Sequence, residues 1–228
     1  LANLSNRALH TTIPPGWLLQ NSDTEAQDLM VVDRVPVELA PHAERTVVCQ
    51  AYCVESADRA PAEGVPFLSL GMAPMAWVKL AEHLQQNKVE GSNAQAAVWA
   101  VANDHDIAAI DPAASILRKF VADLTGRELP WYDKAYAPPS LPGQVFSDVA
   151  TTIHGSVEFV LNTHGAVSIL IHNVHGTLVR TMGKDRHLGP GSYGMEVDLT
   201  VQGWPKGTYT IQFYLDDSRI LKRLEFVV

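Results

Sequence analysis

Short runs of hydrophobic residues that are typical of strands recur through residues 9–56. Apolar, β-branched runs in this region are separated by turn residues, and the last and longest run covers residues 45–54. Alternation along that run puts Cys49 and Cys53 on the same face. We therefore expect residues 9–56 to be a region of strands that ends close to Cys53.

A helical period replaces the strand pattern over residues 72–125, where apolar residues recur every three or four positions. The pattern predicts three helices, at 74–86, from Ser92 onwards, and at 111–124. Asp111 and Pro112 suit the N-cap and the first helical position of the third helix. Strands followed by a small helical group predict an α+β domain over residues 1–137.

Prolines then mark a boundary, and the pattern changes beyond it. Residues 138–150 are rich in proline and read as a linker. Residues 151–228 contain short alternating or apolar runs separated by turn residues, with no helical segment. Six or seven short strands in this length are typical of an all-β sandwich. We expect two domains, an α+β domain at 1–137 and a β-sandwich at 151–228.

Composition narrows the classes of function. The chain has 228 residues, 46% of them hydrophobic, so a sizeable core is expected. The net charge is −8 and no basic stripe with interleaved aromatic residues occurs, which argues against nucleic-acid binding. No apolar run reaches membrane-spanning length. The first residue is Leu1, so we expect a processed form or a part of a longer chain.

The two cysteines are not expected to pair with each other. Cys49 and Cys53 are four residues apart in a predicted strand. Their Cα atoms would then lie about 13 Å apart, whereas a disulfide needs less than about 7 Å.

Cys53 and Gln95 have a chemical interpretation and a structural one. A cysteine thiol and a glutamine carboxamide can condense, with loss of ammonia, into an internal thioester, which is an electrophile. Alternatively, Cys53 is a small core residue, and Ser92 and Gln95 form a capping box in which the Gln95 amide reaches back to the Ser92 backbone. The two interpretations exclude each other, because the condensed carboxamide has lost its amino group.

Other chemistry finds little support in the residues. The histidines, including His172 and His175, lack the spacing of a zinc site. The run 103–106 offers oxygens and one imidazole to a cation, but these residues are also common at helix ends. A Gly-x-Ser-x-Gly elbow and a glycine-rich phosphate loop are both absent. We expect no metal, no cofactor and no catalytic residue, and a protein that is not an enzyme.

The second half resembles a known domain family. Matching residues run from the apolar strand at 167–171 through 176–180 and 205–209 to the closing strand at 221–228. In order and spacing they resemble the FlgD-type immunoglobulin-like domain and the related C-terminal sorting domain of proteins that Bacteroidetes export by the type IX system. The resemblance implies an Ig-like sandwich on an exported protein. Leu141-Pro142-Gly143 stands where the family usually opens with Pro-Asn-Pro, and the chain lacks a terminal lysine motif.

The first half resembles the thioester domain of bacterial surface adhesins. Tyr52-Cys53 matches the family's Tyr-Cys pair, and residues 94–99 match its Thr-Gln-x-Ala-Ile-Trp motif. The resemblance implies that Cys53 and Gln95 form the thioester, with Tyr52 and Trp99 in support. Ala94 replaces the motif's threonine, and the separation of 42 residues between cysteine and glutamine is short for the family.

These features together predict a secreted or cell-surface protein for adhesion or partner binding, located outside the cell or on its outer surface. Attachment would be covalent through the Cys53–Gln95 thioester, and the partner would be a surface protein or a glycan. One alternative is a non-covalent binding module on a sorting or stalk domain. Another is an accessory fragment of a secreted hydrolase.

Overall fold

The computed structural model describes all 228 residues, and the chain divides into two compact units. The first unit contains residues 1–129 and 138–147, and the second contains 130–137 and 148–228. The two units are described separately below.

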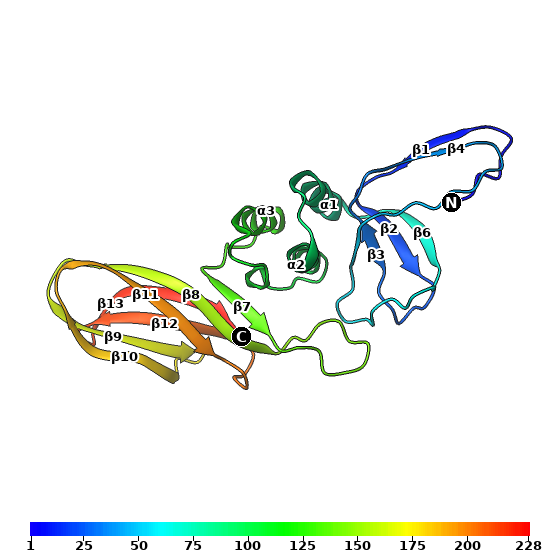
Figure 1. Cartoon of the computed structure of the whole chain (residues 1–228). Coiled ribbons are helices and arrows are strands. Elements are labelled where there is room, and N and C mark those ends of the chain that lie inside the picture. Colours follow the sequence, from blue (N-terminus) through cyan, green and yellow to red (C-terminus); the bar gives the residue numbers. More distant parts are fainter. The chain divides into compact units, whose positions relative to one another are not determined.

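The first unit begins with six strands. They are β1 (Leu9–Ile13), β2 (Trp17–Asn21), β3 (Leu29–Val31), β4 (Val35–Leu39), β5 (Ala51–Cys53) and β6 (Phe67–Met72). β1 and β4 pair as a two-stranded antiparallel ribbon, and the other four form an antiparallel sheet in the order β5-β3-β2-β6 (Figure 1). β5 is therefore an edge strand, with β3 on one side only.

The strand predicted at 45–54 is much shorter than expected. Only Ala51–Cys53 pairs, because its partner β3 is itself three residues long. Just before β5, the Gln50 backbone N–H donates to the Asp33 carboxylate instead of to a neighbouring strand. Cys49 thus lies outside the strand, and neither cysteine is in a disulfide.

Three α-helices and one 3₁₀ turn follow the strands. They are α1 (Met75–Asn87), α2 (Gly91–Ala102), η1 (Ile107–Ala109) and α3 (Ser115–Thr125). The first helical residue of α3 is Ser115, three residues later than the predicted Pro112, because the Asp111 carboxylate accepts a hydrogen bond from the Ala113 N–H and closes a local turn. None of the helices is long and apolar enough to cross a membrane.

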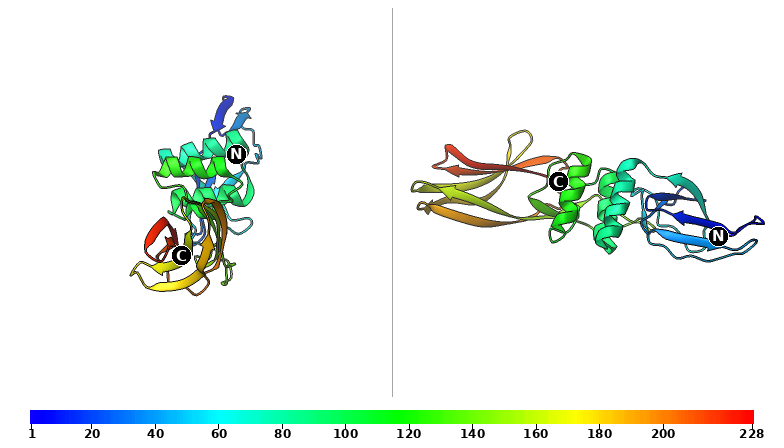
Figure 2. Two further views of the ribbon diagram at one scale, coloured as in Figure 1. Left: turned by 90° about the vertical axis from the view of Figure 1, so that its left-hand side faces the viewer. Right: turned by 90° about the horizontal axis from the view of Figure 1, so that it is seen from above.

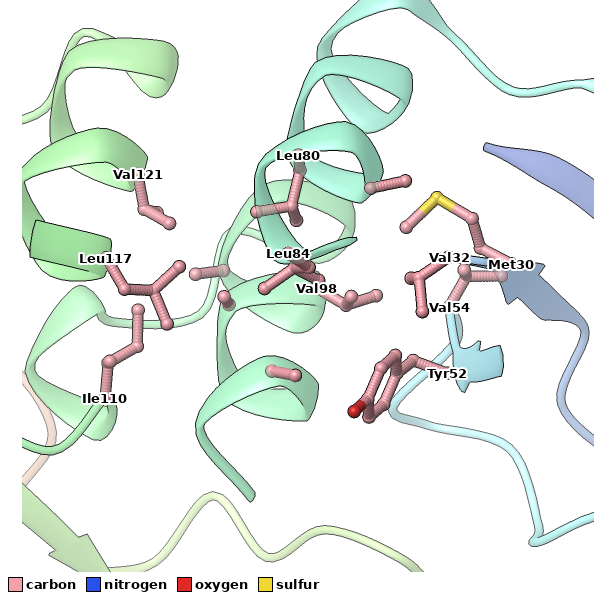
Figure 3. Packing of buried hydrophobic residues seen from close by; sticks show 14 of the residues in the cluster. Met30, Val32, Tyr52, Val54, Leu80, Leu84, Val98, Ile110, Leu117 and Val121 are labelled. Atoms are coloured by element: carbon pink, nitrogen blue, oxygen red, sulfur yellow. The ribbon is translucent and has the colours of Figure 1, made fainter. Parts of the chain in front are cut away.

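The three helices lie side by side, and their apolar faces form one core with β3 and β5 (Figures 2 and 3). Strand residues such as Met30 and Tyr52 face Leu84 and Val98 from the helices in this core. α2 lies in the middle, and the residues that it buries are mainly alanines. Small side chains allow close approach, so α2 lies directly against β5, the strand that carries Cys53.

The second unit consists of strands. They are β7 (Tyr132–Tyr136), β8 (Ala150–Leu161), β9 (Gly165–Asn173), β10 (Leu178–Leu188), β11 (Gly191–Thr200), β12 (Thr208–Leu215) and β13 (Arg219–Val227). They form two antiparallel sheets, in the orders β11-β8-β7 and β10-β9-β12-β13. The prediction of a β-rich fold is confirmed.

Alternation along the strands builds the core of the second unit. In β8 every second residue from Ile153 to Leu161 is buried, and the residues between them are exposed. The two sheets meet through aromatic side chains, with the rings of Phe159 and Phe213 5.1 Å apart. At the start of β12 the Tyr209 hydroxyl donates to the Pro205 carbonyl at 2.8 Å, and its ring stacks on Phe226. That contact fixes the turn that leads into β12.

The proline-rich segment does not act as a simple linker between 1–137 and 151–228. Residues 130–137 supply β7, which pairs with β8 in the second unit. Residues 138–147 then return to the first unit, where the Ala60 N–H donates to the Gly143 carbonyl and the Phe146 ring packs on Trp99. Val145 and Phe146 are half-buried there, so the return shields two apolar side chains in part.

Candidate functional site

Two hydrogen bonds join the Gln95 side chain to the backbone of Cys53. The Gln95 Nε2 donates to the Cys53 carbonyl at 2.8 Å, and the Cys53 N–H donates to the Gln95 Oε1 at 3.2 Å. Both residues are half-buried. The carboxamide therefore acts as a neighbouring strand would at the free edge of β5, and it satisfies both backbone groups of Cys53.

This arrangement places the two thioester candidates side by side. The oxygen and nitrogen of the Gln95 carboxamide form hydrogen bonds with the N–H and the C=O of Cys53. The carboxamide therefore lies alongside the α-carbon of Cys53. The Cys53 sulfur is one rotatable bond from that α-carbon. Rotation about the Cα–Cβ bond of Cys53 sets where its sulfur lies relative to the Gln95 side chain.

The predicted capping box is wrong. α2 begins at Gly91, so Ser92 lies inside the helix, and the N-cap residue Glu90 makes no side-chain cap. Gly91 has a φ of +68°, which suits glycine. The N-cap lies at Glu90, two residues before the predicted Ser92. Ser92 is thus not at the N-cap position, and the Gln95 amide bonds to Cys53 instead.

Tyr52 takes over the role of the helix cap. Its ring is only 8% exposed and lies in the core between β5 and α2 (Figure 3). Its hydroxyl accepts hydrogen bonds from the Gly91 N–H at 3.2 Å and from the Gln50 side chain at 2.8 Å. Burial raises the pKa of Tyr52, so the hydroxyl stays protonated. Tyr52 therefore ties β5 to the start of α2, and this fixes the position of Gln95 opposite Cys53.

An aromatic cluster continues the site along α2. Trp99 lies one helical turn beyond Gln95, with ring centroids 5.7 Å from His105 and 5.5 Å from Phe146. The Trp99 indole nitrogen is buried and makes no hydrogen bond. Sequence reasoning missed Phe146, because it lies in the segment interpreted as a linker.

His105 is held next to the residues that follow β5. Its Nε2 lies 2.8 Å from the Ser56 hydroxyl, and the Ser56 N–H donates to the Asn103 side chain. The run 103–106 follows the end of α2, and no group of three or more metal-ligating side chains comes together in the chain. The His83 ring lies elsewhere, between α1 and α3, where it stacks on the Phe120 ring with the ring centroids 3.8 Å apart. Ser56 had no signal in the sequence pattern, whereas Asn103 and His105 belong to the run 103–106 that the sequence had singled out for a cation.

The two thiols have different surroundings. Burial raises the pKa of Cys53, so its thiol is protonated at neutral pH, although its own backbone N–H opposes this shift. Burial, assisted by the Asp33 carboxylate, also raises the pKa of Cys49. Cys49 lines an apolar cavity of ≈ 270 Å³ beside the β1–β4 ribbon, together with residues such as Trp17 and Leu39. Only Cys53 has a glutamine side chain against its backbone.

No family model, no curated protein and no solved structure matches the chain. The function is therefore argued from the site itself.

Proposed function

We propose that the first unit forms an internal thioester between Cys53 and Gln95 and that it attaches covalently to an amine on a partner. The observation that carries this proposal is the pair of hydrogen bonds that holds the Gln95 carboxamide against the Cys53 backbone. In the condensation the Cys53 sulfur bonds to the Gln95 carbonyl carbon, and the Gln95 nitrogen leaves as ammonia. The thiol proton leaves with that nitrogen.

The hydrogen bonds also suit the chemistry of this step. Negative charge develops on the Gln95 oxygen as sulfur attacks, and the Cys53 N–H already donates to this oxygen. The nitrogen that leaves is held by the Cys53 carbonyl. The donor and the acceptor are both backbone groups, so their positions are fixed before the reaction begins.

Attachment to the partner reverses the condensation, with an amine of the partner in place of ammonia. An amine, such as a lysine of a surface protein, attacks the Gln95 carbonyl carbon, the carbon–sulfur bond breaks, and an amide forms. The proton that the amine loses ends on the Cys53 sulfur. Thiolate is the better leaving group because its pKa of about 8.5 is far below that of an amine. His105, oriented by Ser56, is the base that this part of the site offers for the proton.

The aromatic cluster has a matching role in this proposal. Trp99 and Phe146 continue the same side of α2 beyond Gln95 and limit the access of water. A thioester with limited access to water persists until a partner amine arrives. Such a stored electrophile is suited to a protein outside the cell or on its outer surface.

For the second unit we propose an immunoglobulin-like domain that serves as a stalk or a sorting module. The strand order supports this, because β11-β8-β7 and β10-β9-β12-β13 correspond to an Ig-like pair of sheets with the fourth strand moved beside the third. The Tyr209 hydroxyl bonded to the Pro205 carbonyl four residues upstream has the geometry of a tyrosine corner.

The mass of the intact protein tests the thioester. Loss of one ammonia lowers the mass by about 17 Da, as the condensation requires. We expect this loss in the unchanged chain and in the Cys49→Ala variant, which is the matched control. Cys53→Ala and Gln95→Ala should each have the full mass of their sequence.

A non-covalent binding module is the second candidate, because the two hydrogen bonds satisfy Gln95 and Cys53 without any covalent bond. Its signature is the full mass together with a Cys53 thiol that reacts with a maleimide after unfolding. That result would exclude covalent attachment and favour this alternative.

A further inference from the structure

The apolar cavity that contains Cys49 in its lining lies between the β1–β4 ribbon and the sheet β5-β3-β2-β6. Along β3, Met30 belongs to the helical core, whereas the next residue, Val31, lines the cavity. Because successive residues of a strand point to opposite faces, the cavity lies on the face of the sheet that the helices leave free.

Two apolar faces meet around this cavity. On the ribbon, Val37 and Leu39 line the cavity from alternate positions of β4, and both are buried. On the sheet, Trp17 and Val31 are directly paired neighbours on β2 and β3, and both line the cavity. The ribbon and the sheet thus shield each other from water, but they leave a space of ≈ 270 Å³ between them.

The cavity offers no charge and few free hydrogen-bonding groups. None of its lining residues has an acidic, basic or histidine side chain. The Trp17 indole N–H donates to the Ser69 hydroxyl at 2.9 Å, and the amino group of Leu1 donates to the Arg45 carbonyl. Burial raises the pKa of Cys49, so its thiol is uncharged at neutral pH. A charged ligand would lose its hydration here without gaining a counter-charge, which selects an uncharged one.

The volume sets the size of the ligand. An apolar cavity of about 150 Å³ inside a protein stays dry and binds benzene, a molecule of six carbon atoms. The cavity here is nearly twice as large, so by the same ratio it holds roughly ten carbon atoms. Water gains few hydrogen bonds in such a space, and an unfilled cavity destabilises the fold. A ligand of this size would therefore complete the packing between the ribbon and the sheet.

We infer that this cavity binds the uncharged alkyl chain of a small molecule, with about ten carbon atoms in the cavity. Its apolar walls are aliphatic except for Trp17, which suits a flexible chain better than a rigid ring system. Because Val31 and Val37 are buried, the folded surface of another protein cannot fill the space, whereas a thin chain can. The inference is independent of the thioester, since neither Cys53 nor Gln95 lines the cavity.

Titration of the intact ¹⁵N-labelled chain with a series of straight-chain alcohols, from 1-butanol through 1-hexanol, 1-octanol and 1-decanol to 1-dodecanol, tests the inference. We expect shifts of the amide signals of residues 9–13 and 37–39, and unchanged signals in α3. Affinity should rise about fourfold with each added carbon, as for the burial of one CH₂ group. The rise should stop at about ten carbons, when the cavity is full.

A cavity-filling variant supplies the second measurement. Cys49 lies outside the strands, so Cys49→Phe puts a ring into the cavity without changing the register of the sheet. A ring takes up about half of the volume, and we expect the affinity for 1-octanol to fall at least about tenfold. Val48→Phe is the matched control, because its neighbouring side chain is 91% exposed and does not line the cavity.

Several results would overturn the inference. One is the absence of shifts at residues 9–13 and 37–39 with 1-octanol at about 1 mM, where weak binding is still measurable. Others are equal affinities for 1-butanol and 1-decanol, tighter binding of decanoate than of 1-decanol, and equal binding by Cys49→Phe and Val48→Phe. Shifts at these residues that grow with protein concentration and without any alcohol would assign the site to a second copy of the chain instead. If Cys49→Phe does not fold, the chain-length series with the unchanged chain decides.

Discussion

Replacement of His105 tests whether its side chain acts as the base at the thioester candidate. If it accepts the proton of the attacking amine, His105→Ala slows the reaction with methylamine by about 10²-fold at neutral pH. The rate is measured by the growth of the methylamine adduct in the mass spectrum. His10→Ala, at an exposed side chain of β1, is the control.

Added imidazole sharpens this test, because it can replace a missing base but not a missing structural contact. Partial recovery of the rate in His105→Ala supports a role in proton transfer. An adduct that forms as fast in His105→Ala as in the unchanged chain would show that His105 is not the base.

His154 in the second unit gives a prediction for pH. A hydrogen bond with Asp198 at 2.5 Å raises the pKa of His154, with further contributions from Asp133 and Glu196. Because the folded-state pKa is the raised one, this contact stabilises the fold fully below the ordinary histidine pKa of about 6.5 and loses its effect as pH rises through the raised value. Asp198→Asn should lower the pKa of His154 in an NMR titration. An unchanged titration curve would contradict the assignment of the cause.

The pairing of Gln95 with Cys53 shows what the sequence determines at the residue scale. The motifs at 52–53 and 94–99 identified both residues, but an amide at position 95 satisfies either Ser92 or Cys53 equally well. The choice depends on where α2 begins. The N-cap is Glu90 and not Ser92, and a difference of two residues is below what hydrophobic periodicity defines.

At the scale of secondary structure elements, the contact between β5 and α2 determines the geometry of the site. Tyr52→Phe keeps the buried ring but removes the acceptor for the Gly91 N–H. We expect the free energy of unfolding to fall by about 1 kcal/mol, as for the loss of a helix cap. Denaturant unfolding measures this change. Hydrogen exchange should also become faster in the first turn of α2 and stay unchanged in α1, and equal exchange in both helices would count against the cap.

The sequence predicted the helices α1 and α2 better than the start of α3 or the length of β5. α1 and α2 follow from apolar periodicity, because their buried faces are regular. The start of α3 was wrong, since Asp111 closes a turn locally instead of capping the helix. The length of β5 could not be predicted, because it is limited by its partner β3, which lies about twenty residues earlier in the chain.

At the scale of the whole molecule, the division of the chain makes a prediction about fragments. A fragment cut at the apparent sequence boundary, 151–228, lacks β7 and with it the buried Tyr132, whose hydroxyl accepts from the Val227 N–H. Loss of a buried aromatic residue costs about 3–5 kcal/mol, a large part of the 5–15 kcal/mol that is typical of a domain. We expect fragment 130–228 to unfold cooperatively at a higher temperature than 151–228. Equal melting temperatures would mean that β7 contributes little.

The route of residues 130–147 has a further consequence for a protein exposed to proteases. The chain passes from one unit to the other three times, near residues 129, 137 and 147. A single cleavage between 137 and 138 would give two pieces that each hold an element of the other's unit: β7 stays with the amino-terminal piece, and 138–147 with the carboxy-terminal one. The nicked molecule would therefore stay assembled under native conditions and separate only in denaturant. Loss of covalent continuity at this point would not release the first unit from the second.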